Sequence, residues 1–194
     1  MQGLTDEQVM LAYQEGNVLA MDEILKRYKN PIFHFSYRLL GSYEEAQEVA
    51  QEVFFKVHLK KEAYRVKGKF STWIFTIAHN LCISLIRRRK WILPWPRQKD
   101  QQEAYVDFPS SDPSPEEKVT QNELQKAVKL CIDKLPFLQK EALVLREYHK
   151  MPYEDIAQTM KRSINTIKSL VHRARMNLKE DLLPIVEEVE RGQR

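Results

Sequence analysis

A proline-rich interruption in the middle of the chain constrains its fold more than any other feature. Residues 91–115 hold five prolines and follow no period, whereas apolar residues on both sides recur every three or four positions. Proline inside a helix removes a hydrogen bond and clashes with the preceding turn, so a helix is not expected to continue through this stretch. The interruption therefore predicts a flexible linker or extended arm between a first domain, residues 1–90, and a second domain, residues 116–194.

Both sides of the interruption have the composition of a helical protein. Only five of the 194 residues are glycine, and helical periodicity covers nearly all of the chain outside the linker. Capping-box patterns mark three helix starts: Thr5 with Gln8, Ser42 with Glu45, and Ser114 with Glu117. We expect an all-α fold of two small helical domains, with helices at about 5–16, 18–40 (bent or broken near Pro31), 42–59, 71–89, 115–134, 136–149, 152–160 and 163–179.

The sequence indicates a cytoplasmic protein with reduced thiols. The N-terminus, MQGLTDEQ, lacks the basic and apolar regions of a signal peptide, and no apolar run approaches the roughly eighteen residues of a membrane span. Cys82 and Cys131 lie far apart within helical patterns. We expect both to be core residues rather than redox groups.

No pattern in the chain favours enzymatic chemistry. The five histidines show no metal-ligand spacing, there is no glycine-rich phosphate loop, and no Ser or Cys lies in a recognisable nucleophile elbow. We therefore expect a protein that is not an enzyme and needs no metal or cofactor.

Charge is segregated along the first half of the chain. Residues 41–54 hold four glutamates and no base, whereas residues 55–99 hold twelve Lys or Arg and a single acid, Glu62. An acidic helix followed by a basic one predicts two different partners, one of them anionic.

The stretch Tyr153–Lys179 has the pattern of a helix-turn-helix. Lys161 and Arg162 fill the turn, and Ser163 can cap the second helix. The expected inner face of that helix carries apolar side chains, at Ile164, Ile167, Leu170, Val171, Ala174 and Leu178. Its expected outer face mixes groups that can read base edges with cations that can neutralise phosphates, at Asn165, Thr166, Lys168, Ser169, His172, Arg173 and Lys179. A solvated basic helix on an ordinary bundle is the alternative.

The helix that follows Lys69 combines aromatic, hydroxyl and basic residues, which are the components of a site for single-stranded DNA. Phe70, Trp73 and Phe75 can equally be core residues. The outer face is the better candidate for nucleic acid, and at helical spacing it holds Thr72, Thr76, His79, Asn80, Ile83 and Arg87.

Several of these motifs occur in the order and spacing of one known family. They are GSYEEAQEVAQEVF at residues 41–54, KFSTWIFTIAHN at 69–80 with the arginine run behind it, Leu135-Pro136, and the helix-turn-helix. In them the chain closely resembles an extracytoplasmic-function (group IV) sigma factor of bacterial RNA polymerase. The resemblance spans about Leu4 to Leu183. Within it, the linker matches the family only in being a linker of this kind and not in its residues.

The resemblance implies three sets of site residues. Core RNA polymerase would bind the acidic helix through its clamp helices, at Glu45, Glu48, Gln51, Glu52 and Phe55. The melted minus-ten element, with a flipped base held by Asn80, would contact Phe70, Ser71, Thr72, Trp73, Thr76, His79, Asn80, Arg87 and Arg88. The minus-thirty-five element would be read in the major groove by Arg162, Ser163, Asn165, Thr166, Lys168, Ser169, His172 and Arg173.

The resemblance also implies partners and a role. An alternative sigma factor binds core polymerase and promoter DNA, duplex and melted, to start transcription of a specific regulon, and an anti-sigma factor commonly controls it. The linker would thread toward the active-site and RNA-exit channels of polymerase. Lys168 and Leu170 stand where many members have arginine, so the element read by this chain stays open.

Three other readings compete with this one. An ordinary helix-turn-helix repressor or activator would leave residues 41–90 unexplained. A sigma-mimic adaptor would only sequester an anti-sigma protein and would need no complete reading helix. An RNA-processing enzyme would need a metal or acid–base constellation.

Overall fold

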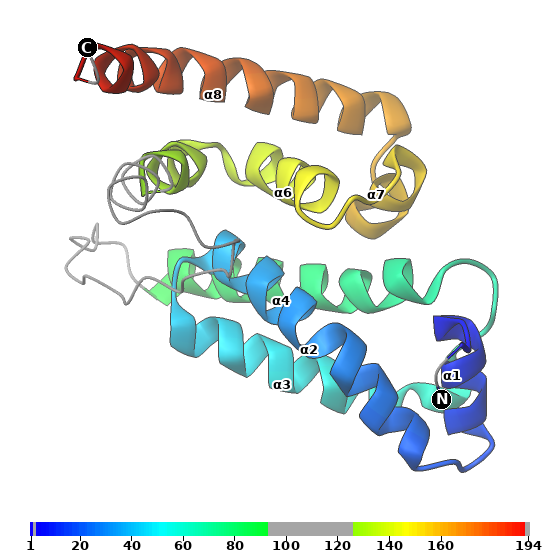
Figure 1. Ribbon diagram of the computed structural model, residues 1–194. Helices are drawn as coiled ribbons and strands as arrows, with labels where there is room; N and C mark the ends of the chain where they lie inside the picture. The colour runs from blue at the N-terminus through cyan, green and yellow to red at the C-terminus, as the bar shows by residue number, and fades with distance from the viewer. Residues whose placement is uncertain (2, 93–125, 193–194) are drawn as a thin grey trace.

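The computed structural model describes residue 1, residues 3–92 and residues 126–192 (Figure 1). The helices are α1 (Asp6–Gln14), α2 (Leu19–Leu40), α3 (Tyr43–Leu59), the short 3-10 helix η1 (Lys61–Ala63), α4 (Phe70–Ile92), a helix over residues 126–134, α6 (Phe137–Glu147), α7 (Tyr153–Met160) and α8 (Ile164–Gly192). The described ranges contain no strand, so the predicted all-α fold is confirmed.

The predicted linker and the cap at Ser114 fall almost entirely outside the described residues. The exception is the start of the linker, because α4 continues to Ile92 and so includes two residues that were assigned to it. We call residues 3–92 the first helical region and residues 126–192 the second helical region.

Local signals set most of the helix starts. Thr5 accepts a hydrogen bond from the backbone N–H of Gln8 while the Gln8 side chain accepts one from Thr5 N, which is a complete capping box. Ser42 caps α3 through the N–H of Glu45, but the return bond is missing because the Glu45 carboxylate pairs with Arg89 instead. The predicted capping box at Ser42 is therefore only half formed.

The break expected near Pro31 does not occur. Pro31 lies inside α2, and the helix is continuous from Leu19 to Leu40. Gly41 ends it with a left-handed conformation, φ 71°, which glycine adopts without steric cost.

In the first helical region, α2, α3 and α4 pack against one another, and α1 closes one end. Phe35, Ile74, Val53 and Phe70 are fully buried among them. In the second helical region, α8 lies along α6 and follows α7 through the helix-turn-helix. Ile167, Val171 and Ala174 form its buried side.

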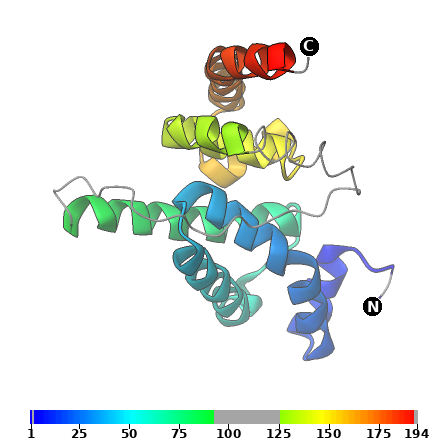
Figure 2. The ribbon, with the colours of Figure 1, turned by 60° about the vertical axis from the view of Figure 1, so that its left-hand side comes forward.

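The two regions pack directly on each other. Helix α4 contacts α7 and α2 contacts α6, so the second region lies on the first in both views (Figures 1 and 2). One continuous apolar cluster includes Phe75 of α4 together with Leu145 of α6 and Ile156 of α7. This packing decides which of the predicted site residues reach the surface.

Candidate nucleic-acid and protein interfaces

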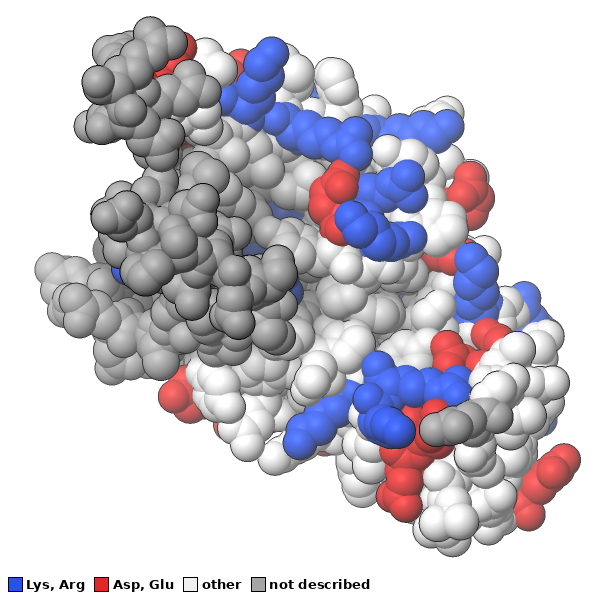
Figure 3. Space-filling model, viewed as in Figure 1, with Lys and Arg blue, Asp and Glu red and all other residues white. Residues whose placement is uncertain are grey.

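The outer face of α8 is exposed as the sequence predicts. Ser163 caps the helix by accepting the N–H of Thr166 at 3.1 Å. The residues expected to contact the minus-thirty-five element are all exposed, namely Arg162, Ser163, Asn165, Thr166, Lys168, Ser169, His172 and Arg173. Ile164, expected inside, is 38% exposed and is the first residue of the helix. Lys and Arg side chains gather along this helix at the top of the molecule (Figure 3).

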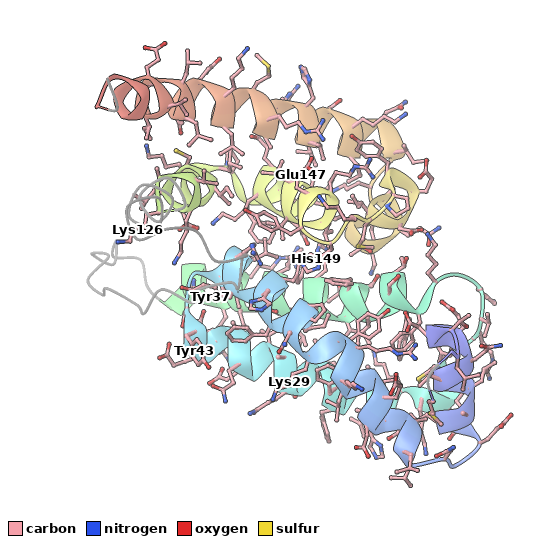
Figure 4. The ribbon with its side chains drawn as sticks, in the orientation of Figure 1. Lys29, Tyr37, Tyr43, Lys126, Glu147 and His149 are labelled. Carbon is pink, nitrogen blue, oxygen red and sulfur yellow. The ribbon has the colours of Figure 1, made fainter. Side chains whose placement is uncertain are left out.

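Polar contacts fix α8 against α6 without using the outer face. Glu147 points from α6 toward α8 (Figure 4) and accepts a hydrogen bond from Arg175 Nε at 3.2 Å. Asn177 donates to Gln139 of α6 at 3.1 Å. Arg175 was not among the predicted site residues, and its side chain serves the packing of the helix instead. The basic outer row is therefore held in one rotational setting and left open to solvent.

The acidic face of α3 is only partly free. Glu48, Gln51 and Phe55 are exposed, and Phe55 retains 54% of its surface. Glu52 pairs with Lys56 at 2.9 Å. Glu45 pairs with Arg89 at the far end of α4, with Arg89 Nε 2.9 Å from Glu45 Oε1. The carboxylate of Glu45 is therefore engaged inside the protein, unlike that of Glu48.

Sequence reasoning missed one exposed apolar residue on α3. Leu59 is 62% exposed and follows Phe55 by one helical turn. The two side chains extend the acidic face with apolar surface, a mixture typical of protein–protein interfaces. Helical spacing from Phe55 was the signal that could have found it.

The aromatic residues at the start of α4 are largely core. Phe70 is fully buried, with its ring 5.3 Å from that of Tyr28 and 5.7 Å from that of Trp73. Its backbone N–H donates to Glu7 Oε1 at 2.7 Å, which ties the start of α4 to α1. Trp73 and Ser71 are partly buried. Phe70 is therefore a core residue and is not itself a contact surface in this structure.

The expected outer face of α4 is divided. Asn80 is exposed, and its side-chain N–H donates to Thr76 O at 2.7 Å, while Arg87 and Arg88 are also exposed. Thr72 and His79 are 6% and 4% exposed, so their expected outward placement is wrong for this structure. The reason is tertiary, because the second helical region covers this part of the helix.

A buried polar pair lies where α4 meets α6. His79 Nδ1 is hydrogen-bonded to Glu141 Oε1, and Glu141 is fully buried. Burial raises the pKa of the Glu141 carboxyl, and the bond to His79 opposes that rise. The second oxygen of Glu141 has no hydrogen-bond partner. Neither the period nor the composition of the sequence indicated this pair.

A cavity of about 540 Å³ opens between the two regions. Its walls combine aromatic and charged side chains, including Tyr28, Lys69, Phe75, His149 and Asp155. Lys69 donates to Asp155 at 2.8 Å across the junction. His149 lies between the two regions (Figure 4), and burial together with the nearby Arg38 lowers its pKa to about 4.

Three further findings concern the cysteines, metal-ligand groups and membrane-spanning helices. Cys82 and Cys131 are buried free thiols, as predicted, and burial raises the pKa of Cys82 to about 12. No group of His, Cys, Asp or Glu side chains in the described ranges is placed to hold a metal ion. Of the helices placed in the structure, none is long and apolar enough to cross a membrane.

Comparison with known proteins gives two family matches. Residues 24–92 match Sigma-70 region 2, and residues 125–178 match Sigma-70, region 4. The first match ends with α4, and the second contains the helix-turn-helix.

The chain is also similar in sequence to several named RNA polymerase sigma factors. The chain is 30% identical over 190 residues to the RNA polymerase sigma-H factor of Pseudomonas aeruginosa, covering 94% of this chain and 96% of the relative. It is 28% identical to the ECF RNA polymerase sigma factor SigW of Bacillus subtilis, covering 87% and 92%. It is 30% identical to SigE of Mycolicibacterium smegmatis, where the match covers 83% of this chain and 61% of the relative.

Two solved structures share the fold. The sigma factor RpoE from Bartonella quintana, in complex with the anti-sigma factor NepR, has a TM-score of 0.63 at 23% identity, covering 83% of this chain and 95% of that one. CnrH, in complex with the cytosolic domain of CnrY, has a TM-score of 0.68 at 18% identity, covering 91% and 96%.

Proposed function

Because this chain belongs to the extracytoplasmic-function sigma factors, we propose that it binds core RNA polymerase, recognises minus-thirty-five and minus-ten promoter elements and initiates transcription of a specific regulon. Sigma factors are regulatory DNA-binding subunits, so no catalytic residue is assigned. The observation that carries the proposal is the exposed outer face of α8, which remains solvent-accessible while the opposite face is buried against α6.

The second helical region is the proposed reader of the minus-thirty-five element. An α-helix fits the major groove, and Asn165, Thr166 and Ser169 offer hydrogen-bonding groups to base edges. Lys168 and Arg173 lie on the same exposed face and supply positive charge for phosphates or guanines. The Ser163 cap leaves the N-terminal turn of α8 well ordered for insertion.

The first helical region is the proposed polymerase-binding and promoter-melting domain. Glu48, Gln51 and Phe55 present an exposed acidic and apolar surface to the clamp helices of the largest polymerase subunit. Asn80, Arg87 and Arg88 are exposed on α4 and available to the melted minus-ten strand. An amide can both donate to and accept from a flipped base, which suits Asn80 to that role.

An anti-sigma factor is the proposed regulator. One of the two solved structures of similar fold, the sigma factor RpoE from Bartonella quintana, is bound to the anti-sigma factor NepR. Because core polymerase works in the cytoplasm, we place the action of this chain there. The linker, which lies almost entirely outside the described residues, is the proposed segment that enters the polymerase channels.

Transcription in vitro tests the proposal directly. Purified chain is added to bacterial core polymerase with a library of genomic fragments from the source bacterium, and new transcripts are mapped by their start sites. We expect starts that share two spaced sequence elements and that vanish without the chain. A repressor or activator would bind duplex DNA but give no new polymerase-dependent starts, and a sigma mimic would give neither transcripts nor sequence-specific duplex binding. Either result would overturn the proposal.

A further inference from the structure

Helix α1 lies beside the loop that leads into α4, and it holds none of the predicted site residues (Figure 1). The loop, residues 64–69, joins η1 to α4. Tyr64 at its start is buried, whereas residues 65–69 are exposed and include three cations and an apolar side chain, Val66. A single strand bound at the start of α4 would pass these side chains, so the shape of the loop matters for the proposed minus-ten contacts.

Side chains from one face of α1 hold both ends of this loop. At its start, Gln14 Nε2 donates to Tyr64 O at 3.1 Å and also to Lys61 O of η1. At its end, Glu7 Oε1 accepts the N–H of Phe70, the first residue of α4, at 2.7 Å. Glu7 and Gln14 are two helical turns apart, which is about 10 Å along the axis of α1. The helix therefore fixes the two ends of the loop relative to each other.

The bond from Glu7 also fixes where α4 begins. The first N–H groups of a helix have no partner within the helix, and the helix dipole favours a carboxylate beside them. The first turn of α4 contains no acid of its own. Glu7 supplies a carboxylate from 63 positions away in the sequence. Loss of that carboxylate would loosen the turn that carries Ser71 and Trp73, two of the proposed minus-ten contacts.

The bond from Gln14 reaches the proposed minus-ten contacts through an aromatic pair. The ring of Tyr64 packs against that of Trp73 with 5.1 Å between centroids, so the residue that Gln14 holds is also in contact with α4. The bonds within the loop are short-range, such as Lys67 N to Arg65 O at 2.8 Å. Six residues can extend to about 20 Å, roughly twice the spacing of the two anchors. Local bonds alone therefore do not fix the position of the loop on α4.

From these contacts we propose that Glu7 and Gln14 are positioning residues for the minus-ten element. They hold the loop 64–69 and the start of α4 in the arrangement that selects among bases of the melted strand, and they act through the loop without contacting DNA. Selectivity needs such support because a binding site discriminates well only when its side chains are held in place. The DNA role rests on the proposed function, whereas the anchoring of the loop rests on the hydrogen bonds alone.

The first arm of the test measures how firmly the loop is held. Trypsin cleaves after Arg65 and Lys67 only when the backbone there opens locally. Gln14→Glu replaces the donor with a carboxylate that faces two carbonyl oxygens, so cleavage at these sites in the full chain should be roughly tenfold faster. Gln8→Glu is the matched control, because it makes the same change on α1 and keeps the capping box. Cleavage after Lys29 in α2, identified by mass, reports any global loss of stability.

Glu7 is tested by a conservative pair of substitutions. Glu7→Ala should also speed cleavage in the loop, because the N–H of Phe70 loses its acceptor. Glu7→Gln should be close to wild type, since the amide oxygen still accepts that N–H. Glu15→Ala, at an exposed position just after α1, is the control and should leave cleavage unchanged.

The second arm measures base selection. The complex of the full chain with bacterial core polymerase is incubated with a pool of short random-sequence DNA single strands, and strands retained by core polymerase alone are subtracted. Gln14→Glu and Glu7→Ala should lower the enrichment of the preferred base roughly three- to tenfold at one or more positions. Glu7→Gln should retain the wild-type preference. Binding of core polymerase and of duplex DNA through α8 should equal that of the wild type in all variants.

Two results would overturn the proposal. Loop cleavage in Gln14→Glu and Glu7→Ala that matches the controls, or that rises only in step with cleavage after Lys29, means that α1 does not hold the loop. Faster loop cleavage with an unaltered base preference means that the anchors position nothing that selects bases. Failure of the proposed function is recognised separately, because the wild-type complex itself then shows no base preference while trypsin still decides whether α1 holds the loop.

Discussion

His79 of α4 and Glu141 of α6 form a buried hydrogen-bonded pair that joins the two helical regions across the junction. They are separated by 62 positions in the sequence. Because removal of one partner leaves the other buried and unpaired, such a pair is costly to break.

Glu141→Ala should therefore destabilise the chain by about 3 kcal/mol, measured by urea unfolding followed by circular dichroism. Glu147→Ala is the control on the same helix. Its partner Arg175 is largely exposed, so this change should cost less than about 1 kcal/mol. Equal losses of unfolding free energy in the two variants would show that the buried pair His79–Glu141 stabilises the chain no more than the exposed pair Glu147–Arg175.

Protonation of His149 in acid should lower the stability of the folded chain. Its ring centroid lies 4.7 Å from that of Phe75, and burial lowers its pKa to about 4. The folded state then binds fewer protons than the unfolded state, whose histidine titrates near 6.5, so this contribution to stability is lost as the pH falls from about 6.5 to 4. The loss should reach at most about 3 kcal/mol.

The raised pKa of Glu141 has the opposite sign, since it adds stability as the pH falls. Comparison of the wild type with His149→Asn isolates the histidine. The difference between their unfolding free energies should shrink from neutral pH toward pH 4. If the difference in unfolding free energy between the two proteins does not change with pH, the pH dependence does not come from His149.

The Ser163 cap of α8 should contribute measurably to the free energy of unfolding. Ser163→Ala removes the acceptor for Thr166 N and should cost about 1 kcal/mol in urea unfolding. Ser169→Ala, on the exposed face of the same helix, should change stability by less than half of that. If the two substitutions change the free energy of unfolding equally, the capping bond does not stabilise α8.

Lys168 and Arg173 should contribute differently to duplex binding. Lys168→Ala should weaken all sequences alike and reduce the salt slope by about 1, because a phosphate contact carries no sequence information. Arg173→Ala should cost about 1–3 kcal/mol at the preferred site and relax one position. Fluorescence anisotropy over a range of salt concentrations measures both. Unaltered affinity, slope and preference in both variants would mean that α8 does not enter the groove.

The exposed glutamate of α3 should matter for polymerase binding. Glu48→Lys should weaken binding of core polymerase by about tenfold, or about 1.4 kcal/mol, because it reverses a charge at the centre of the proposed interface. Asp181→Lys makes the same change on an exposed position of α8 and should have little effect. Binding of Glu48→Lys at wild-type strength in a core-polymerase titration would place the interface elsewhere.

The sequence by itself determined the helices and most of their ends. Thr5 and Ser163 cap their helices through bonds to residues three positions away, and such local chemistry can be read directly from a sequence. The buried and exposed faces of α8 also follow from a period of three to four residues, since Ile167, Val171 and Ala174 are buried and Lys168 is exposed. The family resemblance rested on the same local motifs.

Only the tertiary structure decided which predicted site residues are accessible. Helical period places Thr72 and His79 on the outer face of α4, but the second helical region covers the part of that face that holds them, and Glu45 is engaged by Arg89 from 44 positions away. A periodic pattern reports that a face is polar, but a polar face can still be buried when a distant element supplies partners for it. Long-range pairing of this kind depends on how the helices assemble, and no short window of sequence contains that information.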